Sequence, residues 1–311
     1  MVKQDVETIR LCPAKAPIGR EKSQSMLSKL VQTDQMAFYI TKTDEIQIFA
    51  VGSSQRRMKS DLNGSLEGWR LDGKEFTAAV PTEADEIIEV SYTAVGDRPW
   101  DYVLAQDGIQ NQGNTPPPIN TVIDVIASAD VMAVYRVGIE NANYEADRKK
   151  IKRKISESSP NISGKIVREF QRMSEDDVDI TTHQAYDDRR QMLSDRSIND
   201  IALSASLRLV GPDAEAVAKE LTSVLQPIGN RYYETVGKMN RLDATDVSHE
   251  PSTGAQGKHP RTTFGISRLT SNTSTRINVS PRAAAQVAIP AVSQLSDQAV
   301  QQLNTNPNPN I

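Results

Sequence analysis

The stretch that decides the fold is residues 201–225, which reads IALSASLRLVGPDAEAVAKELTSVL. In its first nine residues, isoleucine, leucine and alanine alternate with small or polar residues, which predicts a β-strand. After the turn Gly211-Pro212-Asp213, apolar residues recur at the spacing of one helix face. Pro227 and Gly229 then end the helix. The apolar positions of this helix are Ala214, Val217, Ala218, Leu221, Val224 and Leu225.

A second strand is predicted directly after this helix, from Tyr232 to Met239. The strand, helix and strand together take about 40 residues, which is typical of the split β-α-β unit of ferredoxin-like folds. The helix is expected to cover one face of the sheet. We therefore predict a ferredoxin-like α+β domain over residues 198–292.

The first half of the chain predicts another α+β domain, over residues 36–140. Apolar strands on either side of a polar turn predict a β-hairpin over 37–51, and a short helix follows near Met58. Further on, the pattern predicts more strands and a helix. The strands are Phe76–Val80, Ile87–Val95 and Val131–Ile139, and the helix contains Val122, Ile123 and Ile126.

Three other segments differ in composition from these domains. Residues 1–35 are assigned to an N-terminal arm, residues 141–197 to a charged helical arm, and residues 293–311 to a polar, disordered tail. The predicted fold class is therefore α+β. It consists of two α/β sandwich units, the second ferredoxin-like, joined by the charged arm.

The charged arm contains the strongest local signal for binding, a basic amphipathic helix. Several cations within two helical turns are able to bind phosphates or anionic lipid headgroups. A solvated helix, neutralised by the acidic residues 175–179, explains the same composition. Both interpretations stay open, and the candidate polyanion-binding residues are Arg148, Lys149, Lys150, Lys152, Arg153 and Lys154.

The overall composition restricts the partners and the compartment. The 311 residues include 36 basic and 40 acidic side chains, so the net charge is 36 − 40 = −4, and any electrostatic partner must be bound by a local patch. A single cysteine, Cys12, is unable to form an internal disulfide. Since no signal peptide or long apolar run occurs, we expect a cytoplasmic location, with the inner face of the cell membrane as a peripheral alternative.

One loop, Ser252 to Lys258, superficially resembles a phosphate-binding loop because it is rich in glycine and ends in Gly-Lys. Its spacing is wrong, since Gly254 lies three residues before Gly257 and His259-Pro260 follows where a hydroxyl should bind magnesium. The remaining Gly-Lys pairs also lack the following Ser or Thr. We therefore interpret the segment as an ordinary loop and assign no cofactor-binding residue.

Metal and catalytic motifs are missing from the sequence as well. The histidines His183, His249 and His259 are far apart and form no zinc motif. The acidic run at 176–179 lacks the spaced oxygens and the glycine of a calcium loop, so a solvated acidic face is favoured. Cys12 has no motif around it that would activate a nucleophile. No catalytic or metal-binding residue is assigned, and we predict that the chain is not an enzyme.

The order of these elements resembles the N-terminal, non-ATPase domain of plasmid-encoded, HerA-like conjugation ATPases of archaea. The resemblance rests on the hairpin 37–51, the segment 81–95, the proline-rich loop before 119–126 and the strand and helix of 202–225. It continues through Phe264-Gly265-Ile266-Ser267 and through 278–290, which resembles the approach to the motor domain.

This resemblance implies a scaffold that positions a DNA-translocating ring ATPase near a type IV secretion channel. Its implied partners are a P-loop motor ATPase or subunits of the channel, and a homo-oligomer is a further expectation. Because the sequence ends where the family continues into its phosphate-binding loop, we expect a stand-alone, split or truncated version. The alternative is a structural or assembly protein of a virus or mobile element, suggested by the loops rich in proline, asparagine and glutamine.

Overall fold

The computed structural model describes most of the predicted strands and helices. Every described element lies in one compact unit, which combines residues before 142 with residues after 198. All but the first residue of the predicted charged arm, and all but the first residue of the predicted strand at 76–80, lie outside the described residues. The described residues are 6–13, 35–63, 66, 69–73, 76, 86–95, 116–141, 201–228, 234–243, 251–255, 273–274, 276–279 and 281–303.

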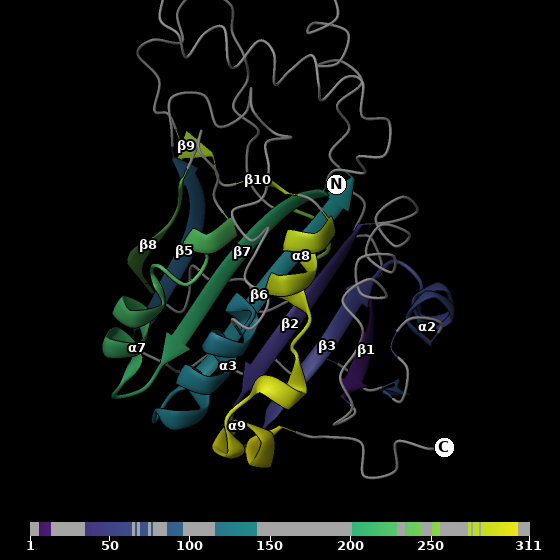
Figure 1. Cartoon of the computed structure of the whole chain (residues 1–311), viewed down its shortest axis with the longest axis horizontal. Coiled ribbons are helices and arrows are strands. Elements are labelled where there is room, and N and C mark those ends of the chain that lie inside the picture. The colour runs from purple at the N-terminus through teal and green to yellow at the C-terminus, as the bar shows by residue number, and fades with distance from the viewer. Residues whose placement is uncertain are drawn as a thin grey trace, which may run out of the picture. The chain divides into compact units, whose positions relative to one another are not determined.

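The described strands form one antiparallel sheet of ten strands (Figure 1). Along the sheet the main order is β4-β1-β3-β2-β6-β7-β5-β8, while β10 pairs with β7 and β9 with β5. The strands are β1 (Glu7–Cys12), β2 (Met36–Lys42), β3 (Ile46–Gly52), β4 (Arg70–Asp72), β5 (Ile87–Val95), β6 (Met132–Asn141), β7 (Ile201–Val210), β8 (Glu234–Leu242), β9 (Thr273–Ser274) and β10 (Ile277–Val279).

The helices connect these strands or follow them. They are α2 (Gln55–Asn63), α3 (Pro118–Ser128), α7 (Ala214–Leu221), α8 (Pro281–Ala288) and α9 (Asp297–Gln302), with short 3-10 turns η1 (Gln226–Ile228) and η4 (Val292–Gln294). The predicted hairpin and the predicted strands at 87–95 and 201–209 are confirmed. The helix predicted over 214–225 ends earlier, at Leu221.

A ferredoxin-like core occupies one half of the sheet. Its chain order is β5-α3-β6-β7-α7-β8, and the spatial order is β8-β5-β7-β6. All three pairings are antiparallel, so β5 lies between β7 and β8 and β7 lies between β5 and β6. Both β-α-β units are therefore split, which is the defining feature of this topology.

This topology corrects the predicted division into domains 36–140 and 198–292. Strand β6, expected in the first unit, pairs with β7, expected in the second, from Met132 opposite Val210 to Asn141 opposite Ile201. The two expected units therefore share one sheet, and the ferredoxin-like core takes strands from both. The division was misplaced because a long charged insertion separates in sequence two strands that are neighbours in space.

The tight turn after β7 depends on Gly211. This glycine has φ 129, and a Cβ at this position would lie 2.7 Å from the carbonyl oxygen of Asp130. The turn therefore packs directly against the end of α3, and only glycine combines this backbone angle with so close an approach. As a result, α7 starts on the same face of the sheet as α3 (Figure 1).

Four more strands extend the sheet beyond β6, and they correct the predicted arm at 1–35. Residues 7–12 form β1, which pairs with both β3 and β4. Ile9 and Leu11 are buried in the main core, and Cys12 is also buried. This strand was missed because only two of its residues are strongly apolar, while Thr8 and Arg10 face the opposite side of the sheet.

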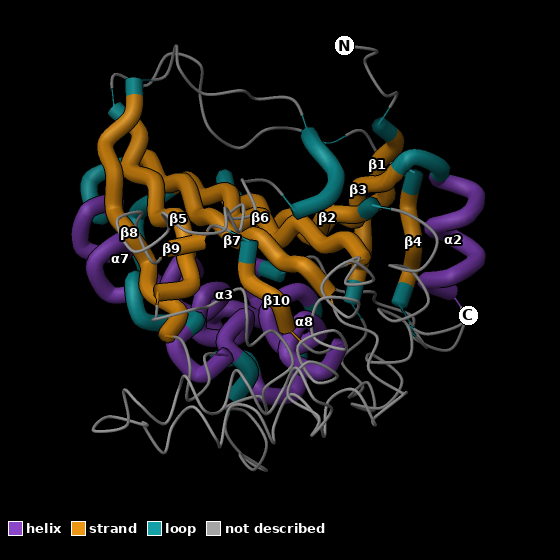
Figure 2. Tube along the Cα trace, turned by 90° about the horizontal axis from the view of Figure 1, so that it is seen from above, coloured by secondary structure: helices purple, strands orange, loops and turns teal. Residues whose placement is uncertain are grey.

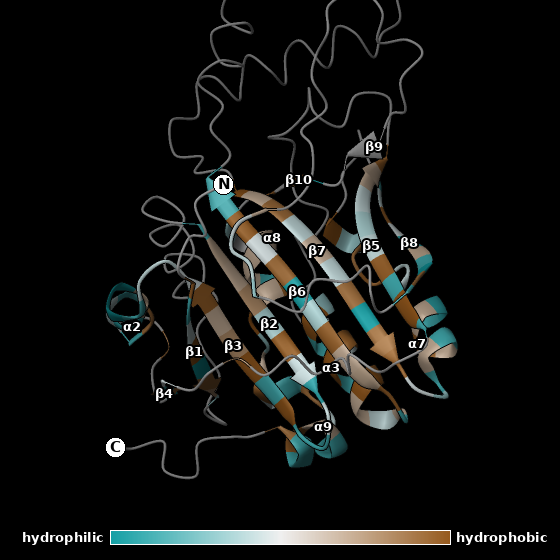
Figure 3. Cartoon of the chain, turned by 180° about the vertical axis from the view of Figure 1, so that it is seen from behind, coloured by the Kyte–Doolittle hydropathy of each residue, from teal (hydrophilic) through white to brown (hydrophobic). Residues whose placement is uncertain are grey.

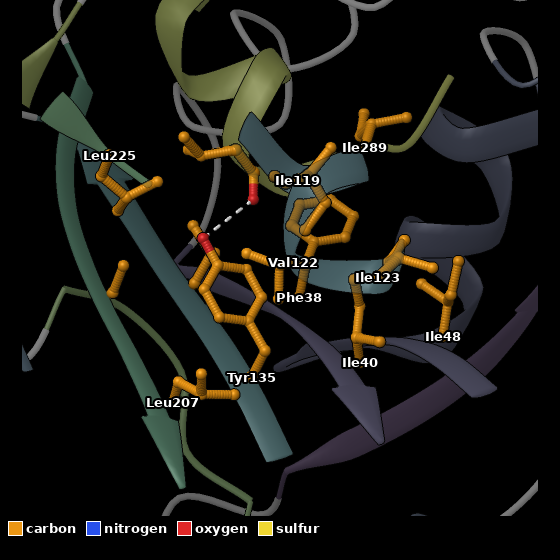
Figure 4. Close-up of a cluster of buried hydrophobic side chains, with 14 of the residues drawn as sticks. Phe38, Ile40, Ile48, Ile119, Val122, Ile123, Tyr135, Leu207, Leu225 and Ile289 are labelled. Atoms are coloured by element: carbon orange, nitrogen blue, oxygen red, sulfur yellow. Dashed lines mark hydrogen bonds between the residues drawn. The ribbon is translucent and has the colours of Figure 1, made fainter. Parts of the chain in front are cut away.

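Helices α3, α7 and α8 cover one face of the sheet, and Figure 2 shows them together on that side. The core between them is drawn in Figure 4, where Tyr135 of β6 points toward α8. Its hydroxyl donates a hydrogen bond of 3.3 Å to the carbonyl oxygen of Val287. In a similar way, the Tyr92 hydroxyl donates to the Leu221 carbonyl at 2.8 Å. These hydrogen bonds join α8 and α7 to the sheet, and each one gives a buried tyrosine hydroxyl its partner.

The C-terminal segment corrects the predicted disordered tail at 293–311. Residues 292–303 form η4, α9 and a closing bridge from Leu303 to Ile46. The side chain of Ser296 caps α9 by accepting a hydrogen bond from the amide of Ala299. The prediction failed because this segment is mostly polar, although its apolar side chains recur at helical spacing. These apolar side chains lie in or against the main core; they are Val292, Leu295, Ala299, Val300 and Leu303.

The edges of the sheet are partly covered. At one edge the amide of Gly237 in β8 donates a hydrogen bond of 2.8 Å to the carbonyl oxygen of Thr222. At the other, α2 packs beside β1, and the side chain of Gln55 donates to the carbonyl oxygen of Thr8 at 3.1 Å. Strand β4, which also lies at this edge, is only three residues long. Short and covered edges oppose pairing with other chains.

Candidate functional site

The predicted polyanion-binding residues, Arg148 to Lys154, lie outside the described residues. The structure does place the strand ends between which their segment runs. Asn141 ends β6, Ile201 begins β7, and the two residues are directly opposite each other. The basic segment is therefore part of an insertion in the hairpin between two paired strands of the ferredoxin-like core.

Within the described residues, the most densely bonded polar group is Arg136 on β6. Sequence reasoning did not select it, although an arginine between Tyr135 and Val137 in an otherwise apolar predicted strand is a recognisable signal. Its side chain lies on the sheet face opposite the helices, and the residue is 8% exposed. A buried guanidinium must be extensively hydrogen-bonded, because it remains charged at neutral pH.

The guanidinium of Arg136 is bonded through all three nitrogens. Nε donates to the Tyr39 hydroxyl at 3.1 Å, and Nη1 donates to the Ser204 hydroxyl at 3.1 Å. Nη2 donates to the carbonyl oxygens of Ser252 at 3.4 Å and Gly254 at 2.7 Å. Among the described residues no carboxylate lies within salt-bridge distance of Arg136. Neutral oxygens and the ring of Tyr39, 5.9 Å away, therefore surround the charge.

Residues 251–255, which we call the strap, lie across this face and are held almost entirely by their main chain. The amide of Ser252 donates to the Tyr39 hydroxyl at 2.9 Å, and that of Gly254 donates to the Met36 carbonyl at 3.2 Å. The amide of Ala255 donates to Glu140 at 3.3 Å. We call the groups that bond to the strap the clamp. The Met36 carbonyl, the Tyr39 hydroxyl and the Glu140 carboxylate accept from strap amides, and Arg136 donates to strap carbonyls.

Two glycines make this close approach possible. Gly254 has φ 73, and a Cβ there would lie 3.0 Å from side-chain oxygens of both Gln35 and Glu140. Opposite it on β6, a Cβ on Gly138 would lie 2.0 Å from the Gly254 carbonyl oxygen. The clamp therefore accepts glycine at position 254 for reasons of both backbone angle and space.

Strap residues 252–255 belong to the loop 252–258 that resembled a phosphate-binding loop. Phosphate binding by such a loop needs free backbone amides that converge on the anion. Here the amides of Ser252, Gly254 and Ala255 donate to groups of the protein itself. Lys258 lies outside the described residues. The described half of the loop therefore docks onto the sheet through its own amides.

Glu140 connects the strap to the segment that precedes β10. Its carboxylate accepts the amide of Ala255 and forms an ion pair with Arg276. The side chain of Glu140 is 14% exposed, so this ion pair is largely shielded from solvent. Asn141 follows directly, so the contact lies at the end of the sheet where the insertion begins.

A second buried cation is Lys42, the last residue of β2. It is paired with Ala133, at the opposite end of β6 from Glu140. Its ammonium donates to the carbonyl oxygens of Ile126 at 2.7 Å and Ala129 at 2.6 Å, which are at the C-terminal end of α3. Burial lowers the pKa of Lys42, and the carboxylates of Asp130 and Asp213 oppose this change. The bonds and the position at the negative end of a helix dipole explain why a lysine is tolerated there.

The part of the outer face formed by β5, β7 and β8 is more polar and more exposed. Arg208 and Glu89 form an ion pair across two strands at 2.9 Å, and Ser91 accepts a hydrogen bond from Asn240 at 3.4 Å. Figure 3 shows this face, with hydrophilic and hydrophobic residues alternating along β7. The polar side chains described here bond to their neighbours in the sheet.

The remaining predictions about sites concern metals, the cysteine and membranes. The three histidines and the acidic run 176–179 lie outside the described residues. Within the described residues, no three or more His, Cys, Asp or Glu side chains form a group able to hold a metal ion. Burial, together with the nearby Asp72, raises the pKa of the Cys12 thiol. No helix within the described ranges is long and apolar enough to cross a membrane.

Comparison with known proteins adds no relative: no protein family, no curated protein and no solved structure matches the chain.

Proposed function

We propose that the chain is a non-catalytic docking module of a conjugation or type IV secretion system, which binds a DNA-translocating ring ATPase of the HerA class. One observation carries the proposal. The basic segment 148–154 belongs to an insertion whose two ends are the paired residues Asn141 and Ile201. In sequence, the charged segment is thus inserted into one hairpin of a large sheet, as expected of a binding element carried by a platform.

The polar groups of the described residues support the same proposal. Arg136, Lys42 and Glu140 all bond to the chain's own main chain. Their contacts stabilise the platform, and they therefore differ from the poorly satisfied, strongly perturbed groups that are typical of active sites. The assignment to the HerA class rests on the resemblance in element order.

A self-assembling structural protein of a virus or mobile element is the competing function. Such an assembly by edge-to-edge strand pairing needs open sheet edges. In the described residues Thr222 bonds to the edge strand β8, and α2 packs beside β1. Because these contacts cover parts of both sheet edges, they favour a docking module that works as a monomer or in a small ring.

Size-exclusion chromatography with light scattering tests the proposal. The chain is mixed with a purified HerA-class motor that lacks its own N-terminal domain, and we expect the two proteins to elute together. Replacing all six basic residues, Arg148, Lys149, Lys150, Lys152, Arg153 and Lys154, by glutamine should weaken binding to the motor, to DNA or to anionic vesicles, and it should flatten the salt dependence. Large particles formed by the chain alone would instead support the structural protein.

A further inference from the structure

We infer that the clamp is an exchangeable binding site for an extended peptide with a central glycine, and that the strap occupies this site as an internal competitor. The proposal adds a peptide site on the outer sheet face and does not depend on which motor the chain binds. It rests on three observations: main-chain recognition, selection for glycine, and a cation, Arg136, that donates to carbonyls of the strap.

Recognition of the strap is almost independent of its side chains. The clamp bonds to the amides of residues 252, 254 and 255 and to the carbonyls of 252 and 254. A side-chain contact within hydrogen-bond distance joins the hydroxyls of Ser252 and Tyr39 at 3.4 Å. Main-chain recognition is how proteins bind extended peptides of varied sequence, so another peptide would offer the clamp the same groups.

Selection for glycine comes from the space around Gly254. Its φ of 73 is unfavourable for other residues, and a Cβ there would lie 3.0 Å from side-chain oxygens of Gln35 and Glu140. A competing peptide therefore needs glycine at the equivalent position, while the residue at position 253 is free to vary.

The cation of Arg136 supplies donors that another peptide would use. Without the strap, Nη2 would lose both carbonyl acceptors. The main-chain carbonyls of a replacement peptide would accept the same charge-assisted hydrogen bonds. Capture of a partner's peptide would thus displace residues 251–255 from the sheet.

The experiment uses the full chain and a fluorescently labelled peptide with the sequence of residues 250–256. The substitution Gly254→Val should release the strap, and the matched control Thr253→Val should leave it docked. We expect the peptide to bind the Gly254→Val variant at least tenfold more tightly than either the wild type or the control. Adding Arg136→Met, or replacing glycine by valine in the peptide, should abolish binding.

Hydrogen exchange of the wild-type chain gives a second readout in case Gly254→Val fails to fold. The proposal predicts that the amides of Ser252, Gly254 and Ala255 exchange at least tenfold faster than those of β2 and β6, because the strap opens locally. Exchange at the rate of global unfolding would overturn it. So would a folded Gly254→Val variant that does not bind the peptide. Neither result would affect the docking proposal, which is tested by elution with the motor.

Discussion

Arg136 and Gly254 are 118 residues apart in sequence, and a hydrogen bond of 2.7 Å joins the guanidinium of the first to the carbonyl oxygen of the second. This bond connects the central strand β6 to a segment that lies beyond the whole ferredoxin-like core. It is also the shortest of the four hydrogen bonds that the Arg136 guanidinium donates to described residues. The strap, the core and the added strands of the sheet therefore meet at one side chain.

Removing this guanidinium should destabilise the fold. We expect Arg136→Met to lower the free energy of unfolding by about 2 to 3 kcal/mol, since it leaves buried oxygens without a donor. The matched control is Arg208→Met, on the neighbouring strand and the same face. Arg208 is 29% exposed and pairs with Glu89, so its loss should cost less than about 1 kcal/mol. Urea titration measures both, and equal losses would contradict the role given to Arg136.

The close approach of the strap to β6 gives a second prediction. The substitution Gly138→Ala places a Cβ 2.0 Å from the Gly254 carbonyl oxygen, and we expect it to cost about 1 to 3 kcal/mol. Gly73→Ala is the control, because there the nearest atom is the flexible side chain of Gln55 at 3.0 Å. Thermal unfolding of both variants is the measurement. A Gly138→Ala variant as stable as the control would show that the Gly254 carbonyl oxygen does not approach β6 so closely.

Two buried tyrosines predict how stability changes at high pH. Burial raises the pKa of both Tyr92 and Tyr135, so the folded chain keeps phenolic protons that the unfolded chain releases above about pH 10. Their contribution to stability is complete below about pH 10 and is lost as the pH rises toward the folded pKa values. Each tyrosine should contribute a slope of up to about 1.4 kcal/mol per pH unit in that window.

The double variant Tyr92→Phe, Tyr135→Phe isolates this effect. It should lose about 1 kcal/mol per hydrogen bond near neutral pH, and its stability should fall less steeply above pH 10. Urea unfolding at a series of pH values gives the comparison. Identical slopes for the variant and the wild type would mean that neither phenol keeps its proton on folding.

Lys42 predicts a pH dependence of the opposite sign. Burial lowers the pKa of Lys42, so the unfolded chain holds this proton more tightly, and stability rises with pH between the folded pKa and about 10.5. At neutral pH, Lys42→Met should still destabilise the chain by about 1 to 3 kcal/mol, because Ile126 and Ala129 lose a hydrogen-bond donor. The deficit of this variant relative to wild type should widen as the pH approaches 10.5; a constant deficit would contradict the lowered pKa.

The sequence predicted the individual elements better than their arrangement. The alternation in 201–209 and the hairpin at 37–51 identified strands correctly, because each pattern matches the period of a half-buried or buried strand. The pairing of β6 with β7 was hidden by the intervening insertion, since local patterns carry no information about neighbours in space. Sequence reasoning saw β7, α7 and β8 as a split unit, but not that β5 and α3 complete the ferredoxin-like core.

The candidate site was harder to predict for a physical reason. Tyr39, Arg136 and Glu140 come from two strands, and the strap binds them through main-chain atoms that leave no motif in the sequence. Gly254 was noticed, but as part of a false phosphate-binding loop. Apolar spacing within 292–303 should have revealed the packed C-terminal segment, whose polar composition was mistaken for disorder.

The most direct test of the central claim replaces the whole insertion, residues 142–200, by Asn-Gly. Because Asn141 and Ile201 are directly opposite each other, a two-residue turn should close the hairpin between β6 and β7. The account predicts that the shortened chain unfolds cooperatively at a melting temperature close to that of the wild type, yet no longer elutes with the HerA-class motor. A shortened chain that fails to fold, or one that folds and binds the motor as tightly as before, would contradict it.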